Sequence, residues 1–482
     1  MCEVADTGIG NLDRVFNPRS VAVVGDKRAL GFMWLRSLSS FRGNVWSVQI
    51  DPNELPGIRE LGVTNHLSLL DIPEPVDYVI AAVPRNVAPK IVEDCIQKRV
   101  GGVCFFTSGF AETQTEEGQR LQRQIVDMAR QSGLNVIGPN CVGVYNPKIG
   151  LRHSEAQQYG GGGPVGFIAQ SGTHATLFSI LAPRSGVRIS KSVSYGNAAV
   201  LDSTDFLEYL GADSETEIIG LYVEGVRDGR RFFRVARDVG RRKPLVIWKG
   251  GETEAGARAT ASHTGALAQS ADVWDALADQ CGAIKVNDLD GMIDVMRMLL
   301  RPKPVKEGRV GLIGMSGGQA VVLTDTFAKA GLDVPLLTEE SYGRLAEFFD
   351  IIGGSYRNPL DVSSTFLLAA DGAASLMKML EILEQDRHVD SIVLELFPVI
   401  RPFEGGENAA DPLLDAIAEF DRRSSKPFMV VVTAGHDEVL AVHARGRLQD
   451  RGVLTFPRFE RAAYALRRLV DYWRYREGIN PN

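Results

Sequence analysis

A single histidine, His263, lies near the end of a segment rich in small residues, Lys249 to Gly265. The segment follows an apolar stretch and has few large apolar side chains, so we expect a long surface loop. A neutral imidazole is a nucleophile near pH 7, and its phosphorylated form can pass the phosphoryl group on. The segment therefore predicts either a phosphate carrier or an exposed histidine without a role.

Two further features could complete a site around such a carrier. Ser171 to Thr173 ends one apolar stretch and begins a predicted helix, whose free amides and dipole bind anions. A plain N-cap explains the same residues. Glu224 follows another apolar stretch, Ile218 to Val223, and a carboxylate can fix the tautomer of a phosphorylated imidazole and balance its charge. A solvated glutamate at a strand end is the alternative for Glu224.

The Ser171 turn has a counterpart later in the chain. Val165 to Ala175 aligns without a gap with Val310 to Ala320, and both read as a buried strand, a Ser-Gly turn and a helix. The match favours a domain duplication over a chance likeness. Ser316 to Gly318 is then either a second anion site or a duplicated turn kept for packing. His174, in the first helical turn, is either a phosphate contact or a plain polar residue.

Strands that alternate with helices must position these residues. The alternation predicts an α/β fold with three doubly wound, parallel-sheet domains, and ligands at the carboxyl ends of the strands. We expect a five-stranded Rossmann-like domain at 12–145, a second domain at 160–300 and a third at 309–477. Gly160 to Pro164 and Arg301 to Gly308 read as linkers.

The composition excludes several classes of protein. The 482 residues carry a formal net charge of -7, which argues against nucleic acid as the partner. Hydrophobic residues make up 44%, and we find no membrane-spanning run and no signal peptide, so we expect a cytoplasmic protein that binds no membrane. The five cysteines lack C-x-x-C spacing, so we predict no disulfide framework and no metal site.

These features together resemble a known family. Glu254 to Ala268 is similar, over its whole length, to the phosphohistidine loop of ADP-forming acyl-CoA synthetases, relatives of succinyl-CoA synthetase. The resemblance runs from about Leu12 to about Glu477. Five further segments carry it, in the order of the family: Ser20 to Gly25, Ile137 to Gly143 with its Gly-Pro-Asn-Cys turn, Phe167 to Gly172, Ser194 to Asp202, and Tyr222 to Gly225.

The resemblance implies a CoA-binding domain followed by two flavodoxin-like, succinyl-CoA-synthetase-type domains. It implies that phosphate attacks an acyl-CoA, that His263 takes the phosphoryl group from the acyl phosphate, and that Glu224 orients the imidazole. Ser171, Gly172 and Thr173 would hold the phosphate oxygens. The implied contacts with coenzyme A are Gly25, Lys27, Arg28, Val83, Pro84, Thr107, Ser108 and Gly109, and those with the thioester end are Asn140, Gly196 and Asn197.

The nucleotide half of this chemistry is not recognised in the sequence. In the family it belongs to an ATP-grasp domain that binds ATP or ADP with Mg, so we expect a separate beta-type subunit and a hetero- or homo-oligomer. The first turn, Gly25 to Arg28, departs from the usual Gly-Ala-Ser, and Asp26 would repel a pyrophosphate there. The alternatives are a CoA- or acyl-CoA-binding protein without phosphoryl transfer and a nucleotide-independent acyl transferase.

Overall fold

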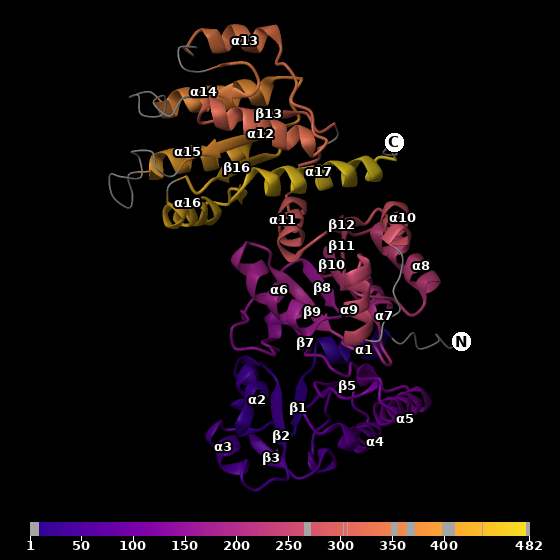
Figure 1. Ribbon diagram of the computed structural model, residues 1–482. Coiled ribbons are helices and arrows are strands. Elements are labelled where there is room, and N and C mark those ends of the chain that lie inside the picture. Colours follow the sequence, from indigo (N-terminus) through magenta and orange to yellow (C-terminus); the bar gives the residue numbers. More distant parts are fainter. Residues whose placement is uncertain are drawn as a thin grey trace, which may run out of the picture. The chain divides into compact units, whose positions relative to one another are not determined.

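The computed structural model describes residues 9–264, 271–301, 303–305, 307–348, 355–362, 372–397, 410–435 and 437–478. The chain divides into two compact units, one ending at Met292 and the other beginning at Ile293. The first unit holds two sheets and the second holds one (Figure 1). The predicted α/β class with three mostly parallel sheets is confirmed. The predicted domain limits at 12–145, 160–300 and 309–477 stay a prediction.

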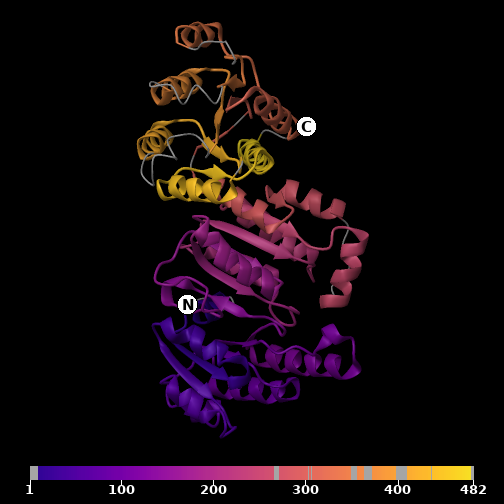
Figure 2. The same cartoon turned by 60° about the vertical axis from the view of Figure 1, so that its left-hand side comes forward.

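The first sheet has six parallel strands in the order β3-β2-β1-β4-β5-β6, which is the doubly wound arrangement. The prediction of five strands is wrong by one, because β3 (Thr64–His66) is short and carries no apolar residue that would reveal it. Helices cover the sheet, with α4 and α5 side by side (Figures 1 and 2). The other strands are β1 (Ser20–Val24), β2 (Asn44–Val48), β4 (Tyr78–Ala81), β5 (Gly102–Phe105) and β6 (Asn135–Ile137). The helices are α2 (Met33–Ser37), α3 (Leu55–Glu60), α4 (Ala88–Lys98) and α5 (Glu116–Ser132).

The second sheet has the order β12-β11-β10-β8-β9-β7 and is parallel except for β7, which runs antiparallel to β9. Its strands are β7 (Gly143–Tyr145), β8 (Val165–Ala169), β9 (Ile189–Ser194), β10 (Ile218–Val223), β11 (Leu245–Lys249) and β12 (Ile284–Val286). Its helices are α6 (Gly172–Arg184), α7 (Ser203–Ala212), α8 (Gly229–Gly240), α9 (Glu254–Thr264) and α10 (Ala271–Cys281). Because β7 follows the last strand of the first sheet directly, the chain crosses between the sheets at the Gly-Pro-Asn-Cys turn.

The two sheets of the first unit share one apolar core. Phe16, at the end of α1 (Ile9–Phe16), stacks on Tyr209 of α7 with ring centroids 4.4 Å apart. Buried residues of both sheets, such as Tyr78 and Val193, belong to the same cluster. The carboxyl ends of β5 and β8 therefore keep a fixed relation to each other within this unit.

The segment that carries His263 is a helix where the sequence led us to expect a loop. From Glu254 to Thr264 it forms α9, so the prediction of a loop from Lys249 to Gly265 is wrong over that range. Alanine at every second position from 255 to 261 favours a helix. Glu254 also pairs with Arg258, one turn later, at 3.0 Å. The lack of large apolar side chains thus reflects a helix whose residues are mostly exposed or half-buried from 254 to 259. The side chain of His263 lies outside the described residues.

The second unit contains a parallel sheet of five strands in the order β14-β13-β15-β16-β17. Its strands are β13 (Val310–Gly314), β14 (Leu360–Asp361), β15 (Ser391–Leu396), β16 (Phe428–Val432) and β17 (Thr455–Phe456). Its helices are α12 (Gly317–Lys329), α13 (Glu339–Ala346), α14 (Gly372–Gln385), α15 (Asp411–Arg423), α16 (Glu438–Asp450) and α17 (Phe459–Arg476), preceded by α11 (Leu289–Leu299). As the internal alignment predicts, β8 with α6 and β13 with α12 are both strand, serine turn and helix, and each serine caps its helix.

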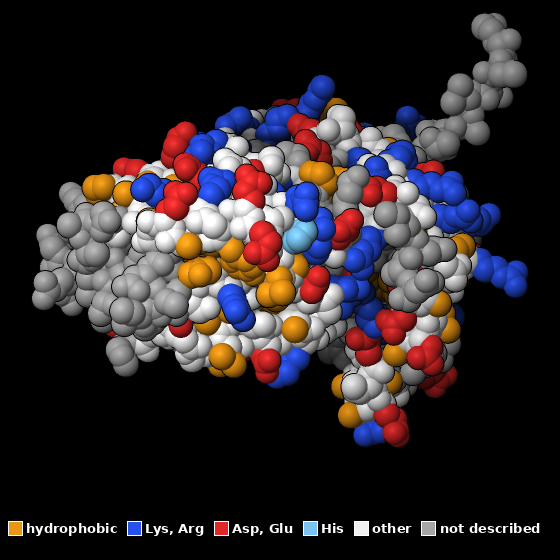
Figure 3. Space-filling view, turned by 90° about the horizontal axis from the view of Figure 1, so that it is seen from above, with side chains coloured by type: hydrophobic (Ala, Val, Ile, Leu, Met, Phe, Trp, Pro, Cys, Tyr) orange, Lys and Arg blue, Asp and Glu red, His pale blue; other side chains and the backbone are white. Residues whose placement is uncertain are grey.

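Charged and apolar side chains are interspersed on the surface drawn in Figure 3. Among the helices that the structure describes, none combines the length and the apolar character that a membrane crossing needs.

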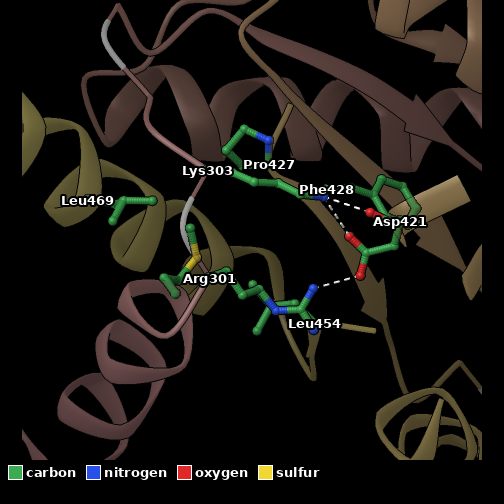
Figure 4. A pocket seen from close by; sticks show the side chains of 8 residues that line it. Arg301, Lys303, Asp421, Pro427, Phe428, Leu454 and Leu469 are labelled. Atoms are coloured by element: carbon green, nitrogen blue, oxygen red, sulfur yellow. Dashed lines mark hydrogen bonds and ion pairs between the residues drawn. The ribbon is translucent and has the colours of Figure 1, made fainter. Parts of the chain in front are cut away.

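The predicted linker after Leu300 is anchored to the second unit by an ion cluster (Figure 4). The Asp421 carboxylate of α15 accepts hydrogen bonds from Arg301 Nη1 at 2.6 Å and Lys303 Nζ at 3.2 Å. Its side chain is only 6% exposed and borders a small cavity of about 10 Å³ with an apolar lining of Met298, Pro427, Phe428, Leu454 and Leu469. Arg301 also donates to the carbonyl oxygen of Gly452 and Lys303 to that of Asp421, but the Asp421 carboxylate is the counter-charge that both contact here.

We expect Asp421→Asn to lower the free energy of unfolding of the second unit by about 2 kcal/mol, because two partly buried cations lose their counter-charge. Urea unfolding followed by circular dichroism measures this. Asp415→Asn on the same helix is the matched control, since Asp415 is 65% exposed and its partner Arg451 keeps a second carboxylate, Asp411; this pair is worth about 0.5 kcal/mol or less. Equal losses in the two variants would contradict a buried, structural role for Asp421.

Candidate active site

The turn at Ser171 lies where the buried strand β8 meets α6. Ser171 is extended, and its Oγ accepts a hydrogen bond from the amide of His174 at 3.3 Å, so the residue is an N-cap. Among the described residues, no acceptor contacts the amides of Gly172 or Thr173. The cap and the predicted anion site are therefore compatible, because the cap uses one amide and leaves two at the positive end of the helix dipole.

A pocket of about 430 Å³ opens at this turn, and residues from both sheets of the first unit line it. Five residues that the sequence singled out belong to its wall, and they come from three separate segments of the chain. The lining residues are Phe106, Asn140, Cys141, Val142, Gln170, Ser171, Gly172, Thr173, Thr176, Leu177 and Gly196. The structure thus brings together the predicted phosphate site and two of the three residues predicted for the thioester end.

The wall from the first sheet is held by a close backbone contact. Gly196 has a φ of 52°, and a Cβ there would lie 2.3 Å from the carbonyl oxygens of Pro139 and Asn140. The amide of Asn197 donates to Pro139 O at 3.0 Å. The Asn197 side chain donates to Glu112 Oε2 at 2.5 Å, so it supports the loop and does not line the pocket.

Glu224 is buried directly after β10, with 6% of its surface exposed, so the alternative of a solvated glutamate is wrong. The hydroxyl of Tyr222 donates to Glu224 Oε1 at 3.2 Å. Gln170 Oε1 accepts from the Glu224 amide at 2.9 Å, and Lys249 Nζ donates to the Glu224 carbonyl oxygen at 2.9 Å. Gln170, which follows β8, and Lys249 of β11 thus hold the backbone of Glu224 beside the Ser171 turn, and Tyr222 of β10 contacts its carboxylate.

Sequence reasoning missed most of the residues that surround Glu224. Gln170, Tyr222 and Lys249 belong to apolar strands or their ends, and their type gave no sign of a role. Burial lowers the pKa of Lys249. Its Nζ donates hydrogen bonds to the backbone oxygens of Glu224 and Gly250. The one available signal was position: all three stand at the carboxyl ends of adjacent strands of a parallel sheet.

The predicted CoA contacts are grouped at the carboxyl ends of β1, β4 and β5. Gly25 has a φ of 83°, and a Cβ there would lie 2.9 Å from Ala82 O and from Val83 Cγ1. Thr107 Oγ1 donates to Val83 O at 2.5 Å, and Arg85 Nη1 donates to Gly109 O at 2.7 Å. Gly25, Val83, Pro84, Thr107, Ser108 and Gly109 thus lie along one edge of the first sheet.

The carboxylate of Asp26 is buried inside the protein, although the sequence led us to expect that it would repel a pyrophosphate at this edge. Its carboxylate is buried and accepts hydrogen bonds from the amides of Lys27 at 3.0 Å and Leu35 at 2.9 Å. Burial raises the pKa of this carboxyl group, against those hydrogen bonds. Lys27 and Arg28 are exposed, so the cations of this turn, and not its acid, are available to a phosphate.

The four cysteines that the structure describes, Cys95, Cys104, Cys141 and Cys281, are buried. Cys104 and Cys141 lie with their Sγ atoms 3.4 Å apart, both buried, and burial raises the pKa of Cys141. A protonated thiol is a poor nucleophile. Within the part of the chain that the structure describes, no cluster of three or more His, Cys, Asp or Glu side chains could hold a metal ion.

Comparisons with known proteins agree with this geometry. Residues 19–147 match the model of a CoA binding domain, and residues 162–299 match that of a succinyl-CoA ligase like flavodoxin domain. The chain is 33% identical to subunit alpha of the ADP-forming acetate–CoA ligase II of Pyrococcus furiosus, over 94% of this chain and 97% of that subunit. It is 36% identical to the ADP-forming acetate–CoA ligase I of Archaeoglobus fulgidus, over 80% of this chain, and spans 55% of that longer protein.

A solved structure is similar over nearly the whole chain. It is the dinucleotide-forming acetyl-coenzyme A synthetase 1 of Ca. Korarchaeum cryptofilum in complex with phosphate and ADP, with a TM-score of 0.80 and 29% identity, covering 97% of this chain and 98% of that one. The sheets and the matched domains define a protein of the succinyl-CoA ligase type. More narrowly, the chain belongs to the family of ADP-forming acetate–CoA ligases.

Proposed function

We propose that this chain is the CoA-binding, phosphohistidine-carrying subunit of an ADP-forming acyl-CoA ligase. One observation carries the proposal: the open amides of α6 and the Asn140 turn of the CoA-type domain line one pocket, and Gln170, which also lines it, accepts a hydrogen bond from the amide of the buried Glu224. Phosphate and thioester can therefore meet there. The alpha subunit from Pyrococcus furiosus, which this chain matches over nearly its whole length, supports the same division of labour.

In the acyl-CoA-consuming direction, a phosphate oxygen attacks the thioester carbonyl, and the C–S bond breaks to release CoA as the thiol. The amides of Gly172 and Thr173, with the Ser171 hydroxyl, hold the phosphate oxygens. An imidazole nitrogen of His263 then attacks the phosphorus atom, and the carboxylic acid leaves as its anion. Positioning and charge stabilisation supply most of the rate in such transfers.

Glu224 fixes the imidazole through its other ring nitrogen and offsets the positive charge that forms on the ring. Gly25, Lys27, Arg28, Val83, Pro84, Thr107, Ser108 and Gly109 are the proposed CoA contacts. Asn140 and Gly196 face the thioester end. The second transfer, from phosphohistidine to ADP, needs a nucleotide site with Mg, which we assign to an ATP-grasp partner subunit in the cytoplasm.

The first half of this reaction can be tested on the chain alone. Incubation with acetyl-CoA and radiolabelled inorganic phosphate is expected to leave an acid-labile, base-stable label on His263, mapped by mass spectrometry. His263→Asn is expected to carry no label while it still binds CoA. Label at another residue, or label that survives in His263→Asn, overturns the proposal. Free acetyl phosphate without labelled protein would instead favour nucleotide-independent acyl transfer.

A further inference from the structure

His174 lies in the first turn of α6, next to the proposed phosphate site, yet the mechanism above does not use it. Its imidazole packs against the rings of Tyr222 and Trp248, with centroids 4.4 Å away in both cases. The Tyr222 and Trp248 rings lie 4.6 Å from each other. Three rings from α6, β10 and β11 therefore form one cluster at the carboxyl edge of the second sheet.

The cluster leads directly to Glu224. Tyr222, one of the three rings, donates its hydroxyl to Glu224 Oε1 at 3.2 Å. Burial, with Glu224 as a smaller contribution, raises the pKa of Tyr222, so the phenol keeps the proton that it donates. Because a tyrosine ring fixes the direction of its hydroxyl, the groups that hold the Tyr222 ring also determine the orientation of the carboxylate.

The imidazole of His174 stays uncharged near neutral pH. Its Nδ1 is buried and has no hydrogen-bond partner among the described residues. Burial lowers the pKa of His174 below its ordinary 6.5, and Glu224 offsets this only in part. The titratable groups next to it are Tyr222, within β10, and Glu224, which follows β10; Lys249, the last residue of β11, donates to the Glu224 carbonyl oxygen. The start of α6 adds the positive end of its dipole.

We propose that His174 is a positioning residue for phosphoryl transfer: its uncharged ring holds Tyr222, and through Tyr222 the Glu224 carboxylate, in the orientation that His263 requires. The inference rests on the proposed function of Glu224 and His263. The proposal also predicts that protonation of His174 slows the phosphoryl transfer. An imidazolium at position 174 would attract the Glu224 carboxylate and compete with His263 for it.

At neutral pH both imidazoles are uncharged, and the rate of His263 labelling is at its plateau. As the pH falls, protonation removes the nucleophilic lone pair of His263, and protonation of His174 lowers the rate further. A phenylalanine at position 174 keeps the ring contacts but cannot charge, so only the decline that His263 causes should remain, and the rate should fall less steeply in acid than in the wild type.

The test compares the rate of His263 labelling, from acetyl-CoA and labelled phosphate, between about pH 5 and about pH 8. His174→Ala is expected to lose about tenfold in the plateau rate, since an aromatic contact is removed, with no change in the KM for acetyl-CoA. His174→Phe should recover most of that loss, and its rate should fall less steeply in acid than that of the wild type. Circular dichroism checks that both variants are folded.

A double-mutant cycle tests whether His174 acts through Tyr222. In a Tyr222→Phe background, which lacks the hydroxyl, His174→Ala is expected to cost far less than tenfold. Two results overturn the inference: an acid decline in His174→Phe identical to that of the wild type, or full additivity of the two substitutions. Both are distinct from failure of the proposed function, in which His263→Asn would still be labelled.

Discussion

Glu224→Gln is expected to slow the labelling of His263 about a thousandfold while leaving the KM for acetyl-CoA unchanged. The amide has the shape of the carboxylate and can still accept from Tyr222, but it carries no charge to offset the imidazolium that forms as the phosphoryl group arrives. The proposed CoA contacts lie on the other sheet of the first unit, so binding of acetyl-CoA should not respond. Rapid-quench measurement of the label against time gives the rate.

The matched control for this variant is Glu217→Gln. Glu217 is exposed and stands just before β10, at the opposite end of the strand that precedes Glu224. Its replacement removes the same charge from the same strand at a distance from the pocket, so its labelling rate should match the wild type. If Glu224→Gln labels as fast as Glu217→Gln, the carboxylate has no part in the transfer.

Much of the fold could be predicted because its signals are local. Buried strands such as β1 and β8 are nearly continuous apolar runs. The serine and glycine of the Ser171 turn indicate the start of α6. Glu224 could be placed near Ser171 because parallel strands end at the same edge. The same reasoning missed β3, which has no apolar residue, and took α9 for a loop because an exposed alanine-rich helix has no apolar stripe.

The contacts that complete the site were beyond such reasoning because they join distant positions. His174 and Trp248 are 74 positions apart, from 174 to 248, and nothing in either local pattern indicates that their rings meet. The orientation of the Asp26 carboxylate depends on a hydrogen bond from the amide of Leu35, and the folding of α2 brings that amide into position. Residue type and strand order predict which edge carries the chemistry, but side-chain direction there depends on tertiary packing.

The contact between the Gly196 loop and the Gly-Pro-Asn-Cys turn shows how strongly such packing can be constrained. We expect Gly196→Ala to lower the free energy of unfolding of the first unit by about 4 kcal/mol and to abolish labelling of His263. The positive φ of 52° alone costs a non-glycine residue about 1 kcal/mol. The larger part comes from the new Cβ, which would lie 2.3 Å from two carbonyl oxygens. Those are backbone atoms and cannot rotate away, so the turn that carries Asn140 must move.

Gly186→Ala separates these two contributions. Gly186 also has a positive φ, 85°, but a Cβ there meets no atom within 4 Å. It should therefore lose only the conformational part, about 1 kcal/mol, and keep the wild-type labelling rate. Urea unfolding and the labelling assay on both variants give the comparison. Equal losses of stability in the two variants would mean that the Gly196 loop can move away from the Gly-Pro-Asn-Cys turn at little cost. The pocket would then not depend on the close contact at Gly196. A larger loss confined to Gly196→Ala, together with loss of labelling, would show that one backbone approach keeps the CoA-type turn and the phosphate site in a single pocket.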